Sequence, residues 1–310
     1  MKNAIFGGGG NAIFAKNKKI LLGLLNSKLN QHFISILNPT LNMLVGDLGN
    51  IPIINLPNKD LIENVVSKLE ILSTKDWDSY ERSWNFRGHP LLNFSTQNLE
   101  SSFNNWIFEN KSKIEEMKQL EEENNQLFID AYELDNELKK DISYNEITIT
   151  VNPSYRYQGE LTEDQKWSRF RKDTLEEFLS YGIGCMMGRY SLNHPGLILA
   201  DSRESQEAQI SAYEAKVGKQ ISDTKFKPDL DGIIPILDGE WFEDDIVART
   251  REFIAVTFPD SSVAENLRFI ENSIGKDIRK YFCKDFYKDH LQTYKKRPIY
   301  WMVQSPNAGF

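Results

Sequence analysis

The chain has 310 residues, 40% of them hydrophobic and 12% aromatic, which indicates a folded protein with apolar cores rather than a disordered one. Its two cysteines, Cys185 and Cys283, are too few for a disulfide framework or a zinc cluster, and no apolar run reaches the ~20 residues of a membrane span. The net charge of −8 argues mildly against nucleic-acid binding. We therefore expect a cytoplasmic protein with no bound metal and no membrane contact.

The charge is unevenly distributed along the chain, and this weakens the argument against nucleic-acid binding. Residues 1–57 carry five basic side chains against one acid, and residues 276–297 carry eight against three. The middle of the chain, from Glu100 to Asp141, is strongly acidic. A protein with basic ends and an acidic centre can still contact phosphate locally.

The first segment contains Gly7–Gly10 between two short apolar runs, which reads as a glycine turn between two strands. A glycine turn can also cradle S-adenosylmethionine, but that arrangement needs a following helix and an acid about twenty residues later. Here a strand-like segment follows, and the first acid is Asp47. A plain turn is favoured, and cofactor binding is the alternative.

Residues 18–37 carry apolar side chains three and four positions apart, which predicts one amphipathic helix that ends before Pro39. The run from Leu44 to Ile53 then reads as a turn leading into a short buried strand. Asn58 or Asp60 can cap a further helix that extends to about Leu72.

The next segment is dense in aromatic side chains and carries two arginines: Trp77, Tyr80, Trp84, Phe86, Arg82 and Arg87. Such a cluster can stack on nucleic-acid bases, or it can pack a helix against a neighbouring part of the protein. Packing is favoured. Residues 97–141 follow as the longest helical pattern, and their acidic faces indicate a structural spacer or a surface for a protein partner.

Residues 147–151 have the composition of a strand, and Asn152-Pro153-Ser154-Tyr155 follows directly. Amino-group methyltransferases hold a flipped base with an Asn/Asp/Ser-Pro-Pro-Tyr/Phe tetrad after a strand. Three of the four positions match, with Ser154 in place of the second proline. Asn152, Pro153 and Tyr155 are therefore catalytic candidates, but an ordinary connector is favoured.

Helices are predicted over residues 160–200, with Thr162 and Gln165 in the positions of a capping box. Gly182, Gly184 and Gly188 are expected to permit close helix packing, and Cys185 to be a buried apolar residue. Residues 202–227 are polar and read as a mobile insertion.

A short strand, Ile233–Leu237, is expected before five clustered acids at residues 238–245. Clustered carboxylates can bind Mg²⁺, but acids at the N-terminus of a helix also complement its dipole, and this second explanation is simpler. Residues 263–301 then interleave bases with aromatic side chains, a pattern that suits sequence-independent phosphate contact or a solvated helix face.

Several long strings occur in an order that resembles one known family. They are GLLNSK, NPTLN and GDLGNIPI near the start, DWDSYERSWNF and HPLL in residues 76–92, LSYGIGCMMGRYSLNHPGLILA in residues 179–200, and YKKRPIYW near residue 300. Together they resemble the later part of the PglX-like adenine-specific DNA methyltransferases of phage-exclusion (BREX) systems, which are related to type IIG restriction-modification enzymes.

The resemblance implies an α+β, mainly helical fold with short strands. Residues 1–73 would be the end of a target-recognition domain, residues 74–142 a linker and long helical spacer, and residues 143–310 a helical C-terminal domain. The expected function is recognition and positioning of double-stranded DNA without methyl transfer by this chain alone. The catalytic domain would be absent, so S-adenosylmethionine would serve the full-length family and no cofactor would bind here.

The resemblance and the charge pattern together give these DNA-binding candidates: Lys16, Lys18, Lys19, Arg82, Arg87, Lys276, Arg279, Lys280, Lys284, Lys288, Lys295, Lys296 and Arg297. Other proteins of the defence system are possible partners through residues 97–141. Two alternatives stay open: a helical protein-interaction scaffold, and a compact methyltransferase that uses Gly7–Gly10 and Asn152–Tyr155.

Overall fold

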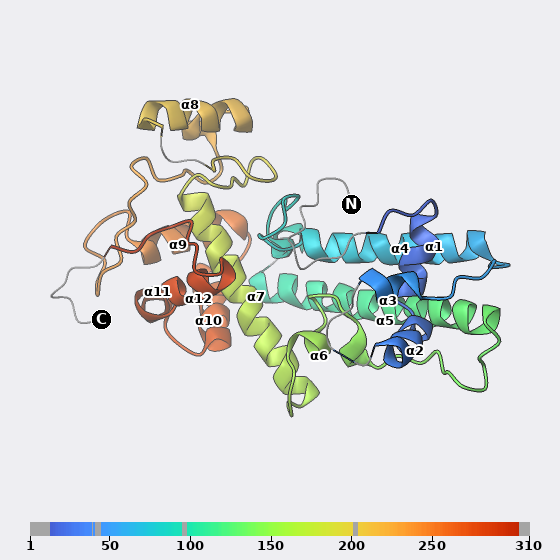
Figure 1. Cartoon of the computed structure of the whole chain (residues 1–310). Helices are drawn as coiled ribbons and strands as arrows, with labels where there is room; N and C mark the ends of the chain where they lie inside the picture. The colour runs from blue at the N-terminus through green and yellow to red at the C-terminus, as the bar shows by residue number, and fades with distance from the viewer. Residues whose placement is uncertain (1–12, 39, 41–44, 95–97, 201–203, 304–310) are drawn as a thin grey trace. The chain divides into compact units, whose positions relative to one another are not determined.

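The computed structural model describes residues 13–38, 40, 45–94, 98–200 and 204–303, which are mainly helical (Figure 1). The predicted mainly helical fold is therefore confirmed. The α-helices are α1 (Lys18–Leu25), α2 (Lys28–Leu37), α3 (Val45–Gly49), α4 (Lys59–Asp78), α5 (Leu99–Ala131), α6 (Pro153–Arg156), α7 (Glu163–Met186), α8 (Gln206–Val217), α9 (Ile246–Thr257), α10 (Val263–Ile274), α11 (Ile278–Lys284) and α12 (Phe286–Thr293). Short 3₁₀ turns lie at Pro90–Phe94, Tyr144–Glu146 and Ile221–Asp223.

The expected short strands do not form in the described ranges, where the one β contact is an isolated bridge between Ser191 and His194. Residues 147–151 bury Ile147, Ile149 and Val151, as an alternating pattern predicts, but they run as turns. The reason is local hydrogen bonding, since the Ile149 amide donates to the Ile147 carbonyl at 3.0 Å. A strand needs a neighbouring strand for its backbone groups, and periodicity alone does not supply one.

The segments expected as strands at residues 51–53 and 233–237 are also irregular, and α3 stands where a turn was predicted. The single helix expected over residues 18–37 is divided into α1 and α2 at Asn26 and Ser27. Ser27 is fully buried, donates to the Leu24 carbonyl at 2.6 Å and accepts from the Asn30 amide, so it ends one helix and caps the next. Gly7–Gly10 lie outside the described residues.

Two compact units make up the chain: residues 1–75 with 111–155, and residues 76–110 with 156–310. Helix α5 contributes its start to the second unit and its remainder to the first. The domain boundaries expected after residues 73 and 142 stay a prediction.

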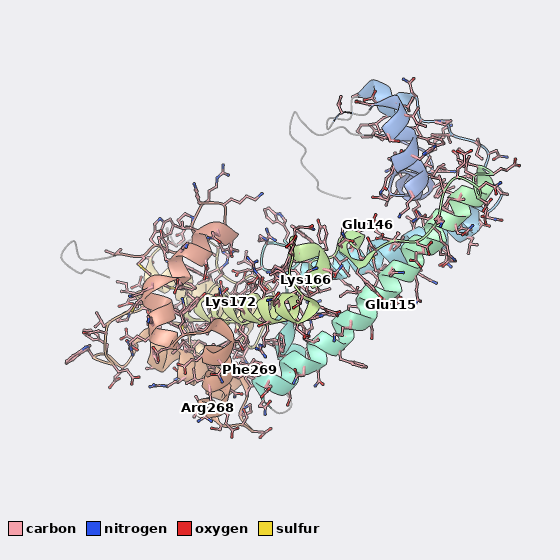
Figure 2. All side chains as sticks on the ribbon, turned by 90° about the horizontal axis from the view of Figure 1, so that it is seen from below. Glu115, Glu146, Lys166, Lys172, Arg268 and Phe269 are labelled. Atoms are coloured by element: carbon pink, nitrogen blue, oxygen red, sulfur yellow. The ribbon has the colours of Figure 1, made fainter. Side chains whose placement is uncertain are left out.

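The first unit packs α1, α2 and α4 around Phe128 of α5, with Leu24 and Ile62 also buried. Gly23 permits this approach, since a Cβ there would lie 2.8 Å from both Val66 and the Asn124 side chain. The Asn124 amide donates to the Gly23 carbonyl at 3.0 Å. Glu146, labelled in Figure 2, forms an ion pair with Lys28 at 3.9 Å.

The second unit is built around α7, which packs against α9, α10 and α12. Its core is aromatic: the Phe178 and Phe253 rings lie 5.3 Å apart, and Trp106 stacks on Phe170 at 5.4 Å. Figure 2 labels Lys166 and Lys172 on α7 and Arg268 and Phe269 on α10. The Phe269 ring contacts Phe103, whose ring centroid is 6.0 Å away.

Helix α7 confirms several local predictions. Thr162 and Gln165 form the capping box at its start. A Cβ on Gly182 would lie 3.2 Å from the Phe253 ring, so this glycine permits the close approach of α9. Cys185 is buried, and burial raises the pKa of its thiol above the ordinary value, which fits a packing role.

The predicted insertion at residues 202–227 contains α8. Ser205 caps this helix, and Gly218 ends it in the left-handed conformation. Tyr213 and Phe226 are buried. The sequence does not predict this helix, because the few apolar residues of the segment do not form a helical stripe.

Candidate nucleic-acid interface

Two segments of the second unit lie near the largely buried carboxylate of Glu81. One is residues 79–90, called the Trp84 loop below, and the other is the end of α12. Glu81 lies 3.5 Å from the Arg189 guanidinium and accepts from the Tyr190 hydroxyl at 3.1 Å. Burial raises the pKa of Glu81, against the lowering effects of Tyr294 and Arg189. Glu81 therefore links the loop to the residues after α7, and Tyr294, which follows α12, lies near enough to lower its pKa.

The Trp84 loop divides its aromatic side chains between the core and the surface. Tyr80 and Phe86 are buried, and the Phe86 ring meets the Tyr190 ring edge-on at 5.4 Å. Trp84 is fully exposed and Trp77 is half exposed. The packing interpretation of this segment is thus correct for two of the four rings and does not account for the other two.

Hydrogen bonds hold the loop in shape around Trp84. The Ser83 hydroxyl donates to Asp78 and accepts from the Asn85 amide at 3.1 Å. The Ser83 amide donates to the Tyr80 carbonyl at 2.9 Å. The predicted DNA-binding residues Arg82 and Arg87 are both exposed on this loop.

The end of α12 is a tight turn at residues 294–297, called the lysine turn below. Lys295 and Lys296 have φ values of 50° and 62°, in the left-handed region that side chains rarely adopt. The Lys296 amide donates to the Leu291 carbonyl at 2.7 Å and closes the turn. Lys295, Lys296 and Arg297 are exposed, so the turn displays three of the predicted cations.

His290 fixes the residues that follow the lysine turn. Its Nε2 accepts from the amides of Ile299 at 3.0 Å and Tyr300 at 3.3 Å, and its ring stacks on Tyr300 at 5.2 Å. Burial and the Arg189 charge lower the pKa of His290 to about 4. The ring is therefore neutral at pH 7, which lets Nε2 act as an acceptor.

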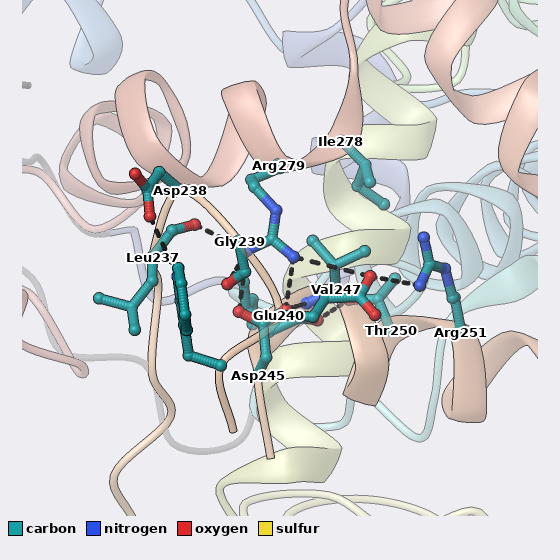
Figure 3. Close-up of polar contacts among 12 residues, drawn as sticks. Leu237, Asp238, Gly239, Glu240, Asp245, Val247, Thr250, Arg251, Ile278 and Arg279 are labelled. Carbon is teal, nitrogen blue, oxygen red and sulfur yellow. Dashed lines mark hydrogen bonds and ion pairs between the residues drawn. The ribbon is translucent and has the colours of Figure 1, made fainter. Parts of the chain in front are cut away.

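Two of the predicted cations are engaged in ion pairs within the protein. Arg279 makes two hydrogen bonds of 2.8 Å to Asp245, which is fully buried, and another to the Leu237 carbonyl at 2.7 Å (Figure 3). Lys276 pairs with Asp285. Lys280, Lys284 and Lys288 are exposed on α11 and α12.

The acidic segment at residues 238–245 has the structural role that the sequence favoured. Asp245 caps α9 and accepts from the Val247 amide at 2.9 Å. Glu240 pairs with Arg251, as Figure 3 shows. In the described part of the chain, no three His, Cys, Asp or Glu side chains gather in a way that could hold a metal ion.

The remaining predicted cations, Lys16, Lys18 and Lys19, lie in the first unit and are exposed. The Lys19 ammonium donates to the Ser67 hydroxyl at 2.6 Å. The structure thus places the cations of the Trp84 loop and of the lysine turn in one unit, although they are about 200 residues apart in the sequence.

Asn152, the leading catalytic candidate, has a structural role in the first unit. Its buried amide donates to the carbonyls of Tyr144 at 2.7 Å and Ile147 at 2.8 Å, and its oxygen accepts from the Ser154 amide at 3.1 Å. Both ends of this amide are therefore engaged by the backbone. Pro153 begins α6, and no strand precedes it in the described residues.

Sequence reasoning missed the residues that hold the interface together: Glu81, Arg189, Tyr190 and His290. It also missed Arg156, which bonds to Glu177 at 2.9 Å and lies 3.2 Å from Asp173. One signal was available, because Glu81 is an acid inside a run of aromatic residues, where a charge needs a partner. The partners themselves are distant in sequence.

No family model matches the chain. The adenine-specific methyltransferase BrxX of Escherichia coli O9:H4 (strain HS) is 32% identical over 98% of the chain, which covers 26% of that protein. The adenine-specific methyltransferase PglX of Lacticaseibacillus casei (strain Zhang) is 32% identical over 99% of the chain, which covers 24% of it. The predicted resemblance is confirmed: the chain is homologous to a part of these methyltransferases and spans about a quarter of their length. Among the described helices, none is long and apolar enough to cross a bilayer.

Proposed function

We propose that this chain is a DNA-recognition and DNA-positioning portion of an adenine-specific DNA methyltransferase of a phage-exclusion system. Its homology to two adenine-specific methyltransferases supports the enzyme class. The observation that carries the DNA-positioning role is the exposure of basic side chains on two segments of the second unit, the Trp84 loop and the lysine turn. In this proposal, methyl transfer from S-adenosylmethionine belongs to the part of the relatives that the chain does not span.

Phosphate contact is the chemistry that the interface suits best. Arg82 and Arg87 lie on one segment, and Lys295, Lys296 and Arg297 lie on the other. Arginine can bond two phosphate oxygens at once, and lysine contributes a compact positive charge. Contacts of this kind fix the register and orientation of a duplex without reading its sequence.

The negative net charge of the chain does not oppose this role. Glu81, the acid at the centre of the interface, is buried and paired with Arg189, so it presents little charge to a ligand. Local potential, rather than the sum over all residues, determines where an anionic ligand binds.

A protein partner on α5 is a second proposal, and the exposure of Phe108 favours it. Phe108 is 75% exposed on a helix that also carries several acids. Aromatic side chains are enriched at protein–protein interfaces relative to the rest of the surface. This role is compatible with DNA positioning because it uses a different element.

The DNA-positioning proposal is tested by equilibrium binding of a fluorescent duplex over a salt series from about 50 mM to 200 mM. We expect binding to weaken steeply with salt. The double variant Arg82→Ala/Arg87→Ala should lower the slope of log K against log salt by about two, because each phosphate contact contributes about 0.9.

Lys139→Ala/Lys140→Ala is the matched control, since it removes two exposed cations from an acidic segment outside the interface. This variant should keep the full slope. Equal losses of slope in both double variants, or no binding at about 50 mM salt, would contradict the DNA-positioning proposal.

A further inference from the structure

Trp84 has a large, mostly apolar side chain, yet this side chain lies on the surface of the protein. Its side chain is fully exposed, whereas the neighbouring rings of Tyr80 and Phe86 are buried. An indole left in water forgoes the free energy that burial of its apolar surface would supply. The loop that displays it is held by Ser83 on both sides, so the exposure does not come from a loose backbone.

The charged residues next to Trp84 in the sequence are basic. Residues 82–90 contain Arg82 and Arg87, both exposed, and no acid. Glu81, the acid before them, is largely buried and pairs with Arg189. The lysine turn of the same unit displays three further exposed cations, Lys295, Lys296 and Arg297.

Trp77 is not equivalent to Trp84. It is half exposed, and the Arg82 guanidinium lies 5.8 Å from its ring centroid, so one face already has a cation beside it. The fully exposed indole of Trp84 therefore has the larger surface available to a flat ligand.

We propose that Trp84 stacks on a DNA base that has left the double helix, while the flanking cations hold the phosphates on either side. This inference rests on the proposed DNA-positioning function and assigns the surface that meets an unpaired base. Aromatic side chains combined with a basic surface are the usual means of binding unpaired nucleotides, because every base has a flat face. An enzyme acting on the exocyclic amine of adenine must also remove its target from the stack.

The charge complementarity favours DNA over a protein as the ligand of Trp84. Tryptophan and arginine are also enriched in protein–protein hot spots, but the cores of such interfaces are depleted of charge. Here the exposed ring stands between two exposed arginines of its own loop, Arg82 and Arg87.

The test compares two DNA probes of equal length that share the labelled strand. In one probe the complementary strand pairs throughout, and in the other it is mismatched at the centre, which leaves a short unpaired bubble. Binding of each to the full chain is measured by fluorescence anisotropy at constant salt. The variants are Trp84→Ala, Trp84→Phe and, as a matched control, Trp241→Ala. Trp241 is 74% exposed within an acidic segment, so its removal also takes an indole from the surface.

The unchanged chain should bind the bubble more tightly than the paired duplex. Trp84→Ala should lose on the order of 10-fold to 100-fold of bubble affinity, the usual range for one stacked base. It should lose less on the paired probe and keep the salt slope, because no charge is removed. Trp84→Phe should retain part of the preference, and Trp241→Ala all of it.

Each outcome separates the two proposals. DNA binding with an unaltered bubble preference in Trp84→Ala would overturn the stacking role and leave DNA positioning intact. Equal losses in Trp84→Ala and Trp241→Ala would also overturn it. Failure of the unchanged chain to bind either probe at low salt would contradict DNA positioning, and the stacking role with it. Circular dichroism of each variant checks that the fold is kept.

Discussion

The Trp84 loop and the acidic segment at residues 238–245 have the same kinds of local contact but differ in charge. Each displays an exposed tryptophan, Trp84 or Trp241, and each is anchored by a carboxylate that an arginine meets. The acidic segment carries five acids and no base, whereas residues 82–90 carry two arginines and no acid. An exposed indole therefore does not identify a DNA-binding surface by itself; the charge around it decides.

The two anchoring carboxylates also differ in how the protein treats their charge. Burial raises the pKa of Glu81 above its ordinary value, because its partners compensate incompletely. The pKa of Asp245 is lowered below its ordinary value. Burial by itself would raise this pKa, but the hydrogen bonds from Arg279 and Val247 outweigh that effect. A carboxylate with two short bonds from one guanidinium is stabilised as an anion, while one at 3.5 Å from its arginine is less so.

The largest expected effect comes from breaking the stronger anchor. Arg279→Ala leaves the buried Asp245 without its cation and should lower the free energy of unfolding by about 3–5 kcal/mol. Urea denaturation measures the loss. Lys280→Ala, which removes the exposed neighbouring cation, should change stability by no more than about 0.5 kcal/mol. A small loss in Arg279→Ala would show that the Asp245 pair is not a structural anchor.

A second prediction concerns His290, which fixes the residues that follow the lysine turn and has no counterpart in the acidic segment. Its pKa is lowered to about 4, so its contribution to stability is complete above the unfolded value of about 6.5. That contribution falls with decreasing pH between these two values, by up to about 1.4 kcal/mol per pH unit. Protonated Nε2 can no longer accept from Ile299 and Tyr300. His290→Gln should lose the part of this dependence that His290 contributes, while the buried His89, whose pKa is lowered to about 3, keeps its own part. A pH profile parallel to that of the unchanged chain would refute the anchoring role.

The third prediction sharpens the contrast between the two carboxylates. The unchanged chain should be more stable than the Asp245→Asn variant, and this difference should be full above about pH 4. It should decline as the pH falls further, because the pKa of Asp245 is lowered in the folded state. For Glu81→Gln the sign reverses, since a raised folded pKa makes the contribution of Glu81 complete below about pH 4 and weaker as the pH rises. Thermal unfolding across the pH range measures both. Profiles of the same sign would remove the distinction.

The smallest expected effect is on stability when either tryptophan is removed. Trp84→Ala and Trp241→Ala should each change the free energy of unfolding by about 0.5 kcal/mol or less, because both side chains are largely exposed. Only Trp84→Ala should alter DNA binding. A large loss of stability in Trp84→Ala, seen by urea denaturation, would mean that the indole packs in the protein instead of meeting a ligand.

Local features followed from the sequence wherever they depend on neighbours along the chain. The Thr162–Gln165 capping box formed as expected, and the acids at residues 238–245 precede α9. The helical pattern expected over residues 97–141 forms one long helix that ends at Ala131. The strand predictions at residues 147–151 and 233–237 were wrong, because apolar alternation predicts burial and does not supply a pairing partner. Arg279 was predicted as a DNA contact, yet it bonds to Asp245, 34 residues away.

By itself, the sequence determined that the chain is mainly helical and where its cations and aromatic rings lie in order. It also contained the strings that match adenine-specific methyltransferases over nearly its whole length. Tertiary structure alone decided that Phe86 is buried and Trp84 exposed, and that Glu81 pairs with Arg189. The physical reason is that burial and ion pairing depend on distances between residues far apart in the chain, which no local pattern encodes.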